Sequence, residues 1–569
     1  MRGARMLLEM LKKYEVDVVF GLPGETTLDW YRDWADFPEI RHIVTRDERS
    51  AAYMAEAYAR VTGRPGIFEM PSPGAAHGAP GVAEAYRGSV PLVFFTSDVP
   101  LNHDLRNTLS TMDQNSVYRG ICKETLTITT AEDIPFLLRR AFRVATSGKP
   151  GPVHIKVPSP VYAEECRPAD LFAQKEFARY PPQRFTAESG AIEAAVDLLA
   201  KAAKPVMVCG QGVLSSGAWD EVRVLAETLR IPVGTTSTGK GAFPEDHPLS
   251  IRVVGARGGL EFSNTILQAA DVVFYCGSNT DSSGTDAWKL PAPDSRKRFI
   301  QLDVSGLEIG NNYPLEVMLI GDARATLSAM TDCARSRGYY PQAAWDIDFQ
   351  TLKNQELERI FGMEDSCRQG LFPVDIIRAL NRHVPEEALM VIDPGVSSIY
   401  STSLYTQKKP GRKFLSNYSV GALGYAIPAS VGAAVAAPDR AVVALGGDGS
   451  FGFNCGEFET MCRLGCNITF CLLKNDSFGW IRGETVLAKG FAPFATEFCE
   501  VDYLKIAEGF GLQVFAPDDS CSLDETIRRA LAVPGPSFVL LEVTSQDKLV
   551  PPVPKWVAGA RNRNLPYIY

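Results

Sequence analysis

Short runs of β-branched and aromatic residues alternate along the chain with longer stretches of helical periodicity. The runs VDVVFGLPG, RHIVTRDE, GIFEMPSPG and PLVFFTSD predict strands that end in Gly, Pro or Ser turns. The stretch 219–229, which lies between later strands, has the period of a helix. Because strands and helices that alternate in this way are typical of parallel α/β units, the pattern predicts an α/β fold of doubly wound parallel sheets.

This alternation occurs three times. Residues 1–165 contain the first set, residues 189–335 the second and residues 371–550 the third, with strands such as AVVALGGDG and ITFCLLKND. Residues 551–569 have no strong periodicity, so we expect an extended C-terminal tail. A chain of 569 residues is long enough for three such domains, each with its own core.

Charge and hydropathy restrict the partners. The net charge is −9 and no Lys/Arg block resembles a nucleic-acid-binding arm, so we expect no DNA or RNA partner. No run of ~18 apolar residues occurs, so we expect no membrane span. Glu9, Lys12 and Lys13 interrupt the apolar N-terminus, which favours an amphipathic helix over a signal peptide. Twelve scattered cysteines, many in apolar runs, indicate free thiols and a cytoplasmic location.

A glycine-rich turn with one acidic residue follows a predicted buried strand, in AVVALGGDGSF at 441–451. Glycines let the backbone approach a phosphate, and the amides of the following helix would face it. A carboxylate at Asp448 would repel a diphosphate unless a cation lay between them. A second buried strand, ITFCLLKNDSFGW, ends at Asn475, and adjacent parallel strands would place the two side chains together. Their oxygens and a main-chain carbonyl suit Mg²⁺. A GDG triplet alone is usually only a turn.

The segments GDGSF and KNDSFGW resemble the metal–diphosphate motif of thiamine diphosphate (ThDP) enzymes. Other stretches resemble the acetolactate synthase large subunit at corresponding places over most of the chain, among them FGLPGETT, TRDERSAAYMAEAYARVTG, SPGAAHG, KGAFPEDHPLS and SVGALGYAIPASVGAAVA. The resemblance implies a pyrimidine-binding domain (1–165), a central domain (189–335) and a diphosphate-binding domain (371–550). It also implies a homodimer or homotetramer, because each active site in the family lies between two subunits.

The resemblance assigns roles to individual residues. Glu48 takes the place of the catalytic Glu that bonds N1′ of the aminopyrimidine and favours the ylid; by itself, a Glu that opens a helix is usually a dipole or capping residue. Leu423, next to Ala422, matches the apolar residue that holds the cofactor bent, and it could equally be a core leucine. Asp448, Asn475 and Ser477 match the metal ligands. The remaining expected cofactor contacts are Gly395, Val396, Ser397, Ser398, Gly447, Gly449, Ser450, Phe478 and Gly479.

Four positions near the expected reaction centre bear on the substrate. Where acetolactate synthases carry Phe-Gln-Glu, this chain has Leu-Ser-Thr, with the hydroxyl of Ser110 in place of an amide. His77 replaces an Asn and could move a proton or serve only the structure. Glu484 replaces a Trp of the keto-acid pocket; it disfavours an anionic substrate and suits removal of a hydroxyl proton, unless it is a solvated loop residue. Glu25 is a candidate proton-transfer group.

Two further departures concern additional ligands. The run GSNTDSS at 277–283 lacks the arginines of FAD-binding relatives, which counts against FAD, and the glycine turn at 210–217 is too weak a signal for a dinucleotide. Lys555, Arg561 and Arg563 form a basic segment near the C-terminus. It is either a solvated terminus or a lid whose cations meet substrate phosphates, as in relatives that cleave 2-hydroxyacyl-CoA.

The sequence therefore predicts a ThDP- and Mg²⁺-dependent enzyme that forms or cleaves a carbon–carbon bond of a small-molecule substrate through a ThDP-bound enamine. An acetolactate synthase-like carboligase or lyase would act on a 2-keto acid or 2-hydroxyacyl compound. A 2-hydroxyacyl-CoA lyase, which releases formyl-CoA from a CoA thioester, and a 2-keto acid decarboxylase are the alternatives. A non-catalytic homologue is disfavoured by the retention of Glu48, Asp448 and Asn475.

Overall fold

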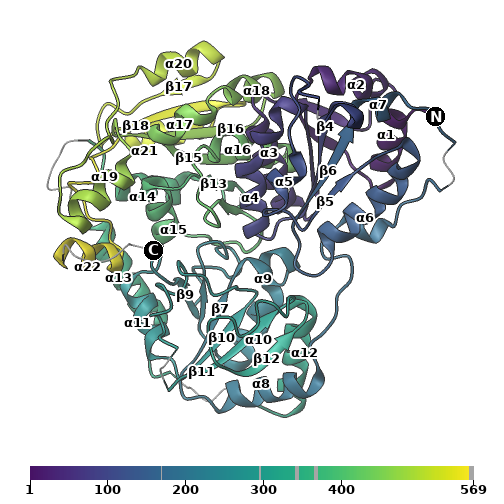
Figure 1. Ribbon diagram of the computed structural model, residues 1–569. Coiled ribbons are helices and arrows are strands. Elements are labelled where there is room, and N and C mark those ends of the chain that lie inside the picture. Colours follow the sequence, from purple (N-terminus) through teal and green to yellow (C-terminus); the bar gives the residue numbers. More distant parts are fainter. Residues whose placement is uncertain (105, 168–169, 294–295, 340–344, 364–369, 563–569) are drawn as a thin grey trace. The chain divides into compact units, whose positions relative to one another are not determined.

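The computed structural model describes residues 1–104, 106–167, 170–293, 296–339, 345–363 and 370–562 (Figure 1). The chain forms three six-stranded sheets in which every strand pairing is parallel, with helices between the strands. The predicted α/β class is therefore confirmed. The contacts between residues divide the chain into two compact units. Unit 1 contains the described residues of 1–183, 417–439 and 453–466, and unit 2 those of 184–416, 440–452 and 467–569.

Unit 1 contains one sheet, with strand order β2-β1-β3-β4-β6-β5. Its strands are β1 (Val18–Gly21), β2 (Arg41–Val44), β3 (Gly66–Met70), β4 (Leu92–Asp98), β5 (Glu124–Thr127) and β6 (Pro152–Pro158). Its helices are α1 (Gly3–Lys13), α2 (Leu28–Trp34), α3 (Glu48–Thr62), α4 (Ala79–Arg87), α5 (Gln114–Tyr118), α6 (Ile134–Thr146), α7 (Ser159–Ala163), α16 (Ala426–Ala436) and α18 (Glu457–Leu464). The expected amphipathic N-terminal helix is α1, which buries Met6, Leu7, Met10 and Leu11.

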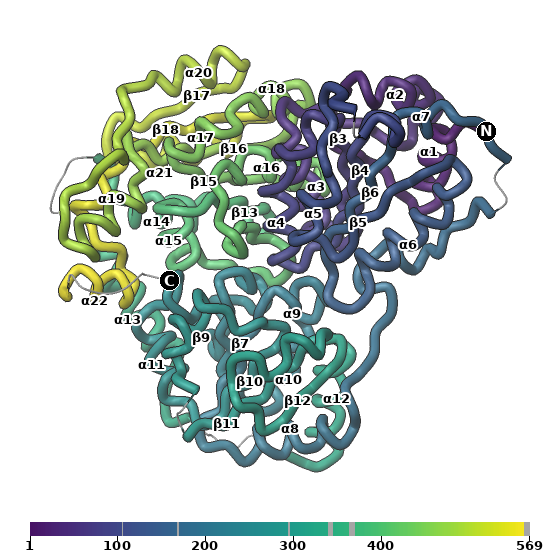
Figure 2. Tube along the Cα trace, viewed as in Figure 1, coloured from purple at the N-terminus to yellow at the C-terminus, as the bar shows by residue number. Residues whose placement is uncertain are grey.

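Helix α16 comes from the third stretch of sequence yet packs against α3 within unit 1 (Figure 2). Its residues Ala426–Ala434 are all buried. Gly432 permits the close approach, because a Cβ at this position would lie 2.1 Å from the carbonyl oxygen of Met54 in α3. A helix that is apolar on every side, as α16 is, requires partners all round.

Unit 2 contains two sheets, of strand order β12-β11-β10-β7-β8-β9 and β14-β13-β15-β16-β18-β17. The strands of the first are β7 (Pro205–Cys209), β8 (Val233–Thr235), β9 (Ser250–Val253), β10 (Val272–Cys276), β11 (Arg298–Asp303) and β12 (Leu315–Ile320). Those of the second are β13 (Leu389–Ile392), β14 (Phe414–Ser416), β15 (Val442–Gly447), β16 (Ile468–Lys474), β17 (Gln513–Phe515) and β18 (Ser537–Glu542).

One hydrophobic cluster in unit 2 contains residues of both sheets and of the helices between them, so the two sheets share part of their core. The helices of this unit are α8 (Ser189–Lys201), α9 (Gln211–Ser216), α10 (Trp219–Leu229), α11 (Glu261–Ala269), α12 (Ala323–Ser336), α13 (Phe349–Phe361), α14 (Pro373–His383), α15 (Val396–Leu404), α19 (Gly479–Gly483), α20 (Tyr503–Phe510), α21 (Leu523–Leu531) and α22 (Pro554–Asn562). Helix α17 (Asp448–Asn454) begins directly after β15.

The described part of the C-terminal segment, residues 551–562, is not the extended tail that the sequence pattern predicts. Residues 554–562 form α22, and the side chain of Trp556 is fully buried. The ring of Trp556 meets that of Trp480 edge to face, with centroids 4.8 Å apart. One buried indole provides enough apolar area to fix a short helix whose periodicity is weak.

Among the described helices, none is long and apolar enough to cross a membrane. The described cysteines are free thiols.

Candidate active site

The carboxyl edge of the unit 1 sheet gathers four of the residues expected near the reaction centre. Each follows a different strand: Glu25 follows β1, Glu48 follows β2, His77 follows β3 and Ser110 follows β4. Because all these strands are parallel and adjacent, their carboxyl ends meet at one edge, where open α/β sheets bind ligands.

Glu48 and His77 are in direct contact. Glu48 opens α3 behind the N-cap Asp47, whose side chain accepts a hydrogen bond from the amide of Arg49. The Glu48 side chain is buried, and its Oε2 lies 3.0 Å from Nδ1 of the more exposed His77. A Cβ at Gly74 would lie 2.1 Å from Oε1 of Glu48, so only glycine leaves room for this carboxyl. The position of the carboxyl is thus set by its surroundings on two sides.

Ser110 lies in a turn after β4 and Glu25 in the short 3₁₀ helix η1 (Glu25–Thr27) of the loop after β1; both loops are fastened to the segment before His77. The Ser72 hydroxyl donates to the carbonyl oxygen of Ser110 at 2.6 Å, and the Ser72 amide donates to the Thr26 hydroxyl at 3.2 Å. Ser110 has a left-handed φ of +69°, which is uncommon for a residue with a side chain. Glu25 is exposed to solvent. The structure therefore places both loops beside the Glu48–His77 pair, although it gives no direct contact of either side chain with that pair.

The loop that carries Ala422 and Leu423 is held by a residue that sequence reasoning missed. The buried carboxylate of Glu84, in α4, accepts hydrogen bonds from the amides of Ser419 (3.1 Å) and Val420 (2.7 Å). Arg60 of α3 lies 3.5 Å from the same carboxylate. In the sequence Glu84 looks like any solvated helix residue, so no local signal marks it. Leu423 itself is only partly buried, as a residue that meets a ligand would be.

In unit 2, Asp448 and Asn475 lie together at the ends of the adjacent strands β15 and β16, where their spacing along the chain predicts them. Oδ2 of Asp448 accepts hydrogen bonds from the amides of Asn475 (2.8 Å) and Asp476 (2.6 Å). The Ser477 hydroxyl donates to Oδ1 of Asn475 at 3.0 Å. Burial raises the pKa of the Asp448 carboxyl, because loss of water disfavours its charged form. A bound cation would restore that form, so the donor set fits Mg²⁺.

The backbone around this pair is shaped by glycine. A Cβ at Gly449 would lie 2.7 Å from the ring of Phe478, and one at Gly479 would lie 2.3 Å from the Asn475 side chain. Gly395 has a φ of +108° and precedes the first turn of α15, which contains Val396, Ser397 and Ser398. Gly447 and Ser450 flank Asp448, and the amides at the start of α17 follow. Such a glycine-rich edge beside helix N-termini suits a diphosphate.

Glu484 starts a π-helical turn, η6 (Glu484–Lys489), which packs against α22. Turns of this kind are rare and occur frequently at functional sites. The Glu484 side chain is partly buried. Lys555 of α22 is paired with Asp286 at 2.7 Å, so its ammonium is engaged within the chain. Arg561 is exposed, and Arg563 lies outside the described residues. Among the three basic residues of the expected lid, Arg561 is thus the one that the structure describes as exposed to solvent.

The glycine turn at 210–217 has a packing explanation. A Cβ at Gly210 would lie 2.4 Å from the carbonyl oxygen of Gly277, and one at Gly212 would lie 2.7 Å from its Cα. The glycines therefore allow two backbone segments of the central region to touch, which accounts for them without a nucleotide. The expected lack of FAD stays a prediction.

Comparison with known proteins places the chain in a family. Models of the thiamine pyrophosphate (ThDP) enzymes match residues 1–117 (N-terminal TPP binding domain), 192–330 (central domain) and 393–541 (C-terminal TPP binding domain). The probable acetolactate synthase large subunit of Methanocaldococcus jannaschii is 29% identical over 99% of this chain and 95% of its own length. The acetolactate synthase isozyme 1 large subunit of Escherichia coli is 28% identical over 98% and 96%. The chain therefore belongs to the thiamine diphosphate-dependent enzymes and is acetolactate synthase-like, as its motifs predict.

Proposed function

We propose that this enzyme is a ThDP- and Mg²⁺-dependent carboligase or lyase that forms or cleaves the bond next to the carbonyl carbon of a 2-keto acid or 2-hydroxyacyl compound. The observation that supports this proposal most strongly is that the buried Asp448 and the partly buried Asn475 lie together at the ends of two adjacent strands. The similarity to acetolactate synthases, which extends over nearly the whole length of both chains, supports a reaction at a carbon–carbon bond.

In this proposal the diphosphate-binding residues act as an anchor. Asp448, the side-chain oxygen of Asn475 and the carbonyl of Ser477 would hold Mg²⁺, and the amides at the starts of α15 and α17 would receive the diphosphate. Ala422 and Leu423 support the ring system. When bound, ThDP supplies a nucleophilic carbon that adds to carbonyl carbons.

Glu48 is the residue proposed to transfer the proton that activates ThDP. Its buried carboxyl would share a proton with N1′ of the aminopyrimidine of bound ThDP. His77, in contact with Glu48, is suited to exchange that proton with solvent because it is the more exposed partner. Ser110, Glu25 and Glu484 are the residues proposed to act on the substrate. A homodimer or homotetramer with active sites between subunits, as the family resemblance implies, is part of the proposal.

A 2-hydroxyacyl-CoA lyase is the second candidate. It is favoured by Glu484, a carboxylate suited to accept a hydroxyl proton, and by its partial burial on a π-helical turn beneath α22. The pairing of Lys555 with Asp286 weakens the part of this idea that needs a basic lid.

Product analysis with pyruvate, benzoylformate and a 2-hydroxyacyl-CoA tests the proposal. Condensation products from pyruvate support the carboligase, whereas formyl-CoA with a carbonyl compound supports the lyase. Simple decarboxylation without condensation would identify a 2-keto acid decarboxylase. No turnover of any of the three by ThDP-loaded enzyme would contradict the proposed substrate class.

Glu484→Gln is expected to lower kcat about tenfold with little change in KM, because it removes a proton acceptor needed only in the transition state. Steady-state kinetics on the substrate found by the product analysis measure both constants. Glu497→Gln is the matched control: Glu497 is a nearby exposed carboxylate that pairs with Arg482. Equal kinetics of the two variants would remove Glu484 from the site.

Arg561→Gln separates the two candidates in another way. If the substrate carries a CoA handle, we expect KM to rise about threefold and to become less dependent on salt, because an exposed ion pair with phosphate is weak and screened. A 2-keto acid substrate should show no such change. KM values measured at low and high salt give the answer, and an unchanged KM for an acyl-CoA that is turned over would show that α22 does not contact it.

A further inference from the structure

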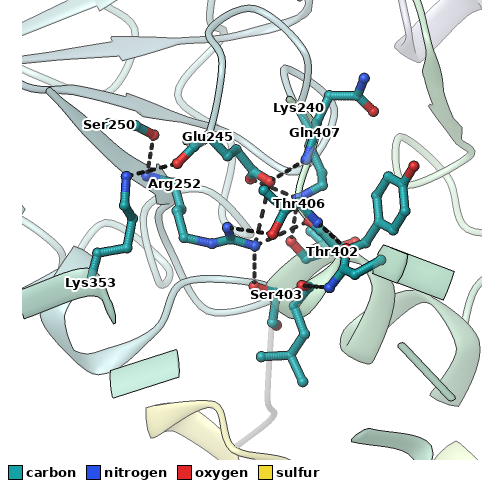
Figure 3. A network of polar contacts seen from close by, with 12 residues as sticks. Lys240, Glu245, Ser250, Arg252, Lys353, Thr402, Ser403, Thr406 and Gln407 are labelled. Atoms are coloured by element: carbon teal, nitrogen blue, oxygen red, sulfur yellow. Dashed lines mark hydrogen bonds and ion pairs between the residues drawn. The ribbon is translucent and has the colours of Figure 1, made fainter. Parts of the chain in front are cut away.

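Two buried cations, Lys240 and Arg252, lie at the C-terminal end of α15, and a third, Lys353, lies beside Glu245 (Figure 3). Lys240, Arg252 and Lys353 have exposed fractions of 0%, 2% and 2%. Lys240 and Arg252 share the carboxylate of Glu245, which is 1% exposed, whereas Lys353 contacts the main-chain carbonyl of Glu245. Lys240 and Glu245 belong to the segment that follows β8, Arg252 to β9 and Lys353 to α13. The cluster thus lies outside the predicted catalytic residues but inside the same unit as Asp448.

Two of these cations bind the last carbonyl groups of α15. The ammonium of Lys240 donates to the carbonyl oxygens of Thr402 (3.0 Å) and Tyr405 (2.7 Å). The guanidinium of Arg252 donates to those of Ser403 and Tyr405, both at 3.1 Å. The final carbonyls of a helix have no partner within the helix and carry its partial negative charge, so buried cations are well matched to them.

Glu245 fixes the two cations in place. Its Oε1 lies 2.6 Å from the Lys240 ammonium and its Oε2 lies 3.4 Å from the Arg252 guanidinium. The same Oε2 accepts a hydrogen bond from the amide of Gln407 at 2.9 Å, just past the end of α15. The cluster therefore fastens the central region to both the helix end and the chain that leaves it.

The opposite end of the same helix carries the expected diphosphate loop. Helix α15 runs from Val396 to Leu404, and Gly395, Ser397 and Ser398 lie at its start. A helix of nine residues moves as one rigid rod, so a shift or tilt at its C-terminal end displaces the amides at its N-terminal end. The clamp at one end thereby sets the geometry at the other.

Stability alone does not account for so many buried charges. Burial lowers the pKa of Lys240 and of Lys353 to about 8, because the low-dielectric interior disfavours the charged ammonium. Apolar side chains of similar volume commonly stabilise a core at least as well as buried ion pairs. A need to hold the C-terminal end of α15 in one position explains why charged hydrogen-bond donors lie there.

We propose that Lys240 and Arg252, oriented by Glu245, are positioning residues that act through α15 to hold the Gly395–Ser398 loop ready for the cofactor diphosphate. This inference rests on the proposed function, in which that loop receives the diphosphate.

The experiment compares Lys240→Met with Lys353→Met. Lys353 is equally buried, but its ammonium donates to the carbonyls of Glu245 (2.8 Å) and His247 (3.0 Å) and not to α15. Both variants lose one buried cation and keep all but the last atom of the side-chain length, so both should lower the melting temperature. We expect the Kd for ThDP with Mg²⁺, measured by calorimetry, to rise about tenfold in Lys240→Met and less than about twofold in Lys353→Met.

Hydrogen exchange of the amides at 396–399 provides a second readout without turnover. These amides should exchange faster in Lys240→Met than in Lys353→Met. If Lys240→Met does not fold, Arg252→Lys serves in its place, because it keeps the charge but is shorter and lacks the guanidinium that also donates to the Thr406 hydroxyl; it should raise the Kd in the same direction.

Equal Kd values and equal exchange in the two lysine variants would overturn the positioning role. That outcome is distinct from failure of the proposed function, in which wild-type protein would bind no ThDP or Asp448→Ala would bind it normally.

Discussion

Asp448→Ala is expected to raise the Kd for ThDP with Mg²⁺ by about 100-fold or more. Loss of a residue that merely supports a metal ligand commonly costs about 10- to 100-fold in affinity, and loss of the ligand itself should cost at least as much. In the proposed site the Asp448 carboxylate would also attract the cation that screens the charge of the diphosphate. Isothermal titration with ThDP at fixed Mg²⁺ measures the change.

A matched control is available in the same turn. Asp476→Asn removes one negative charge from a residue that pairs with Lys474 at 2.9 Å and is not an expected metal ligand. Its Kd should stay within about threefold of the wild-type value, as for an exposed charge. Because Asp448 also accepts three backbone amides, circular dichroism must show that both variants keep the native fold. Normal ThDP affinity in folded Asp448→Ala protein would exclude this metal site.

The proximity of Asp448 and Asn475 could be predicted from the sequence because it follows from few assumptions. Both residues stand directly after buried strands, and successive strands of an α/β unit usually lie side by side and parallel. The structure pairs β15 with β16 in this way. The same reasoning applies to Glu25, Glu48, His77 and Ser110, whose common edge depends only on the parallel order of four strands.

Contacts between distant segments could not be predicted. The sequence pattern assigns α16 to the third domain, but in the structure α16 packs most extensively against α3. This close packing depends on the absence of a Cβ at Gly432. The helix at the C-terminus depends likewise on Trp556 meeting Trp480, which no local pattern reveals. Buried charges are the hardest case: Glu84 and Lys240 look solvated in the sequence, because their partners are backbone amides and carbonyls supplied from far along the chain.

Glu48→Gln is expected to bind ThDP with nearly normal affinity yet turn over about 100-fold or more slowly. Glutamine keeps the shape of the side chain and still fits beside Gly74, but its amide cannot share a proton with N1′ of the aminopyrimidine. General acid–base groups typically contribute about 10²- to 10⁴-fold to a rate, which sets the scale of the loss. The variant also loses an acceptor for His77, which lies 3.0 Å from the present carboxylate.

The adjacent residue provides the comparison for this variant. Asp47→Asn changes an acid that caps α3 rather than one that faces the cofactor, and asparagine caps a helix about as well as aspartate. Its kcat should therefore stay close to the wild-type value. The two variants are compared by the kcat on the substrate that the product analysis identifies and by the rate at which bound ThDP exchanges its reactive C–H proton with D₂O. A slow exchange in Glu48→Gln alone would locate the defect in cofactor activation. Rapid exchange and near-normal turnover in that variant would show that another group activates the cofactor, and His77 would then be the first residue to replace.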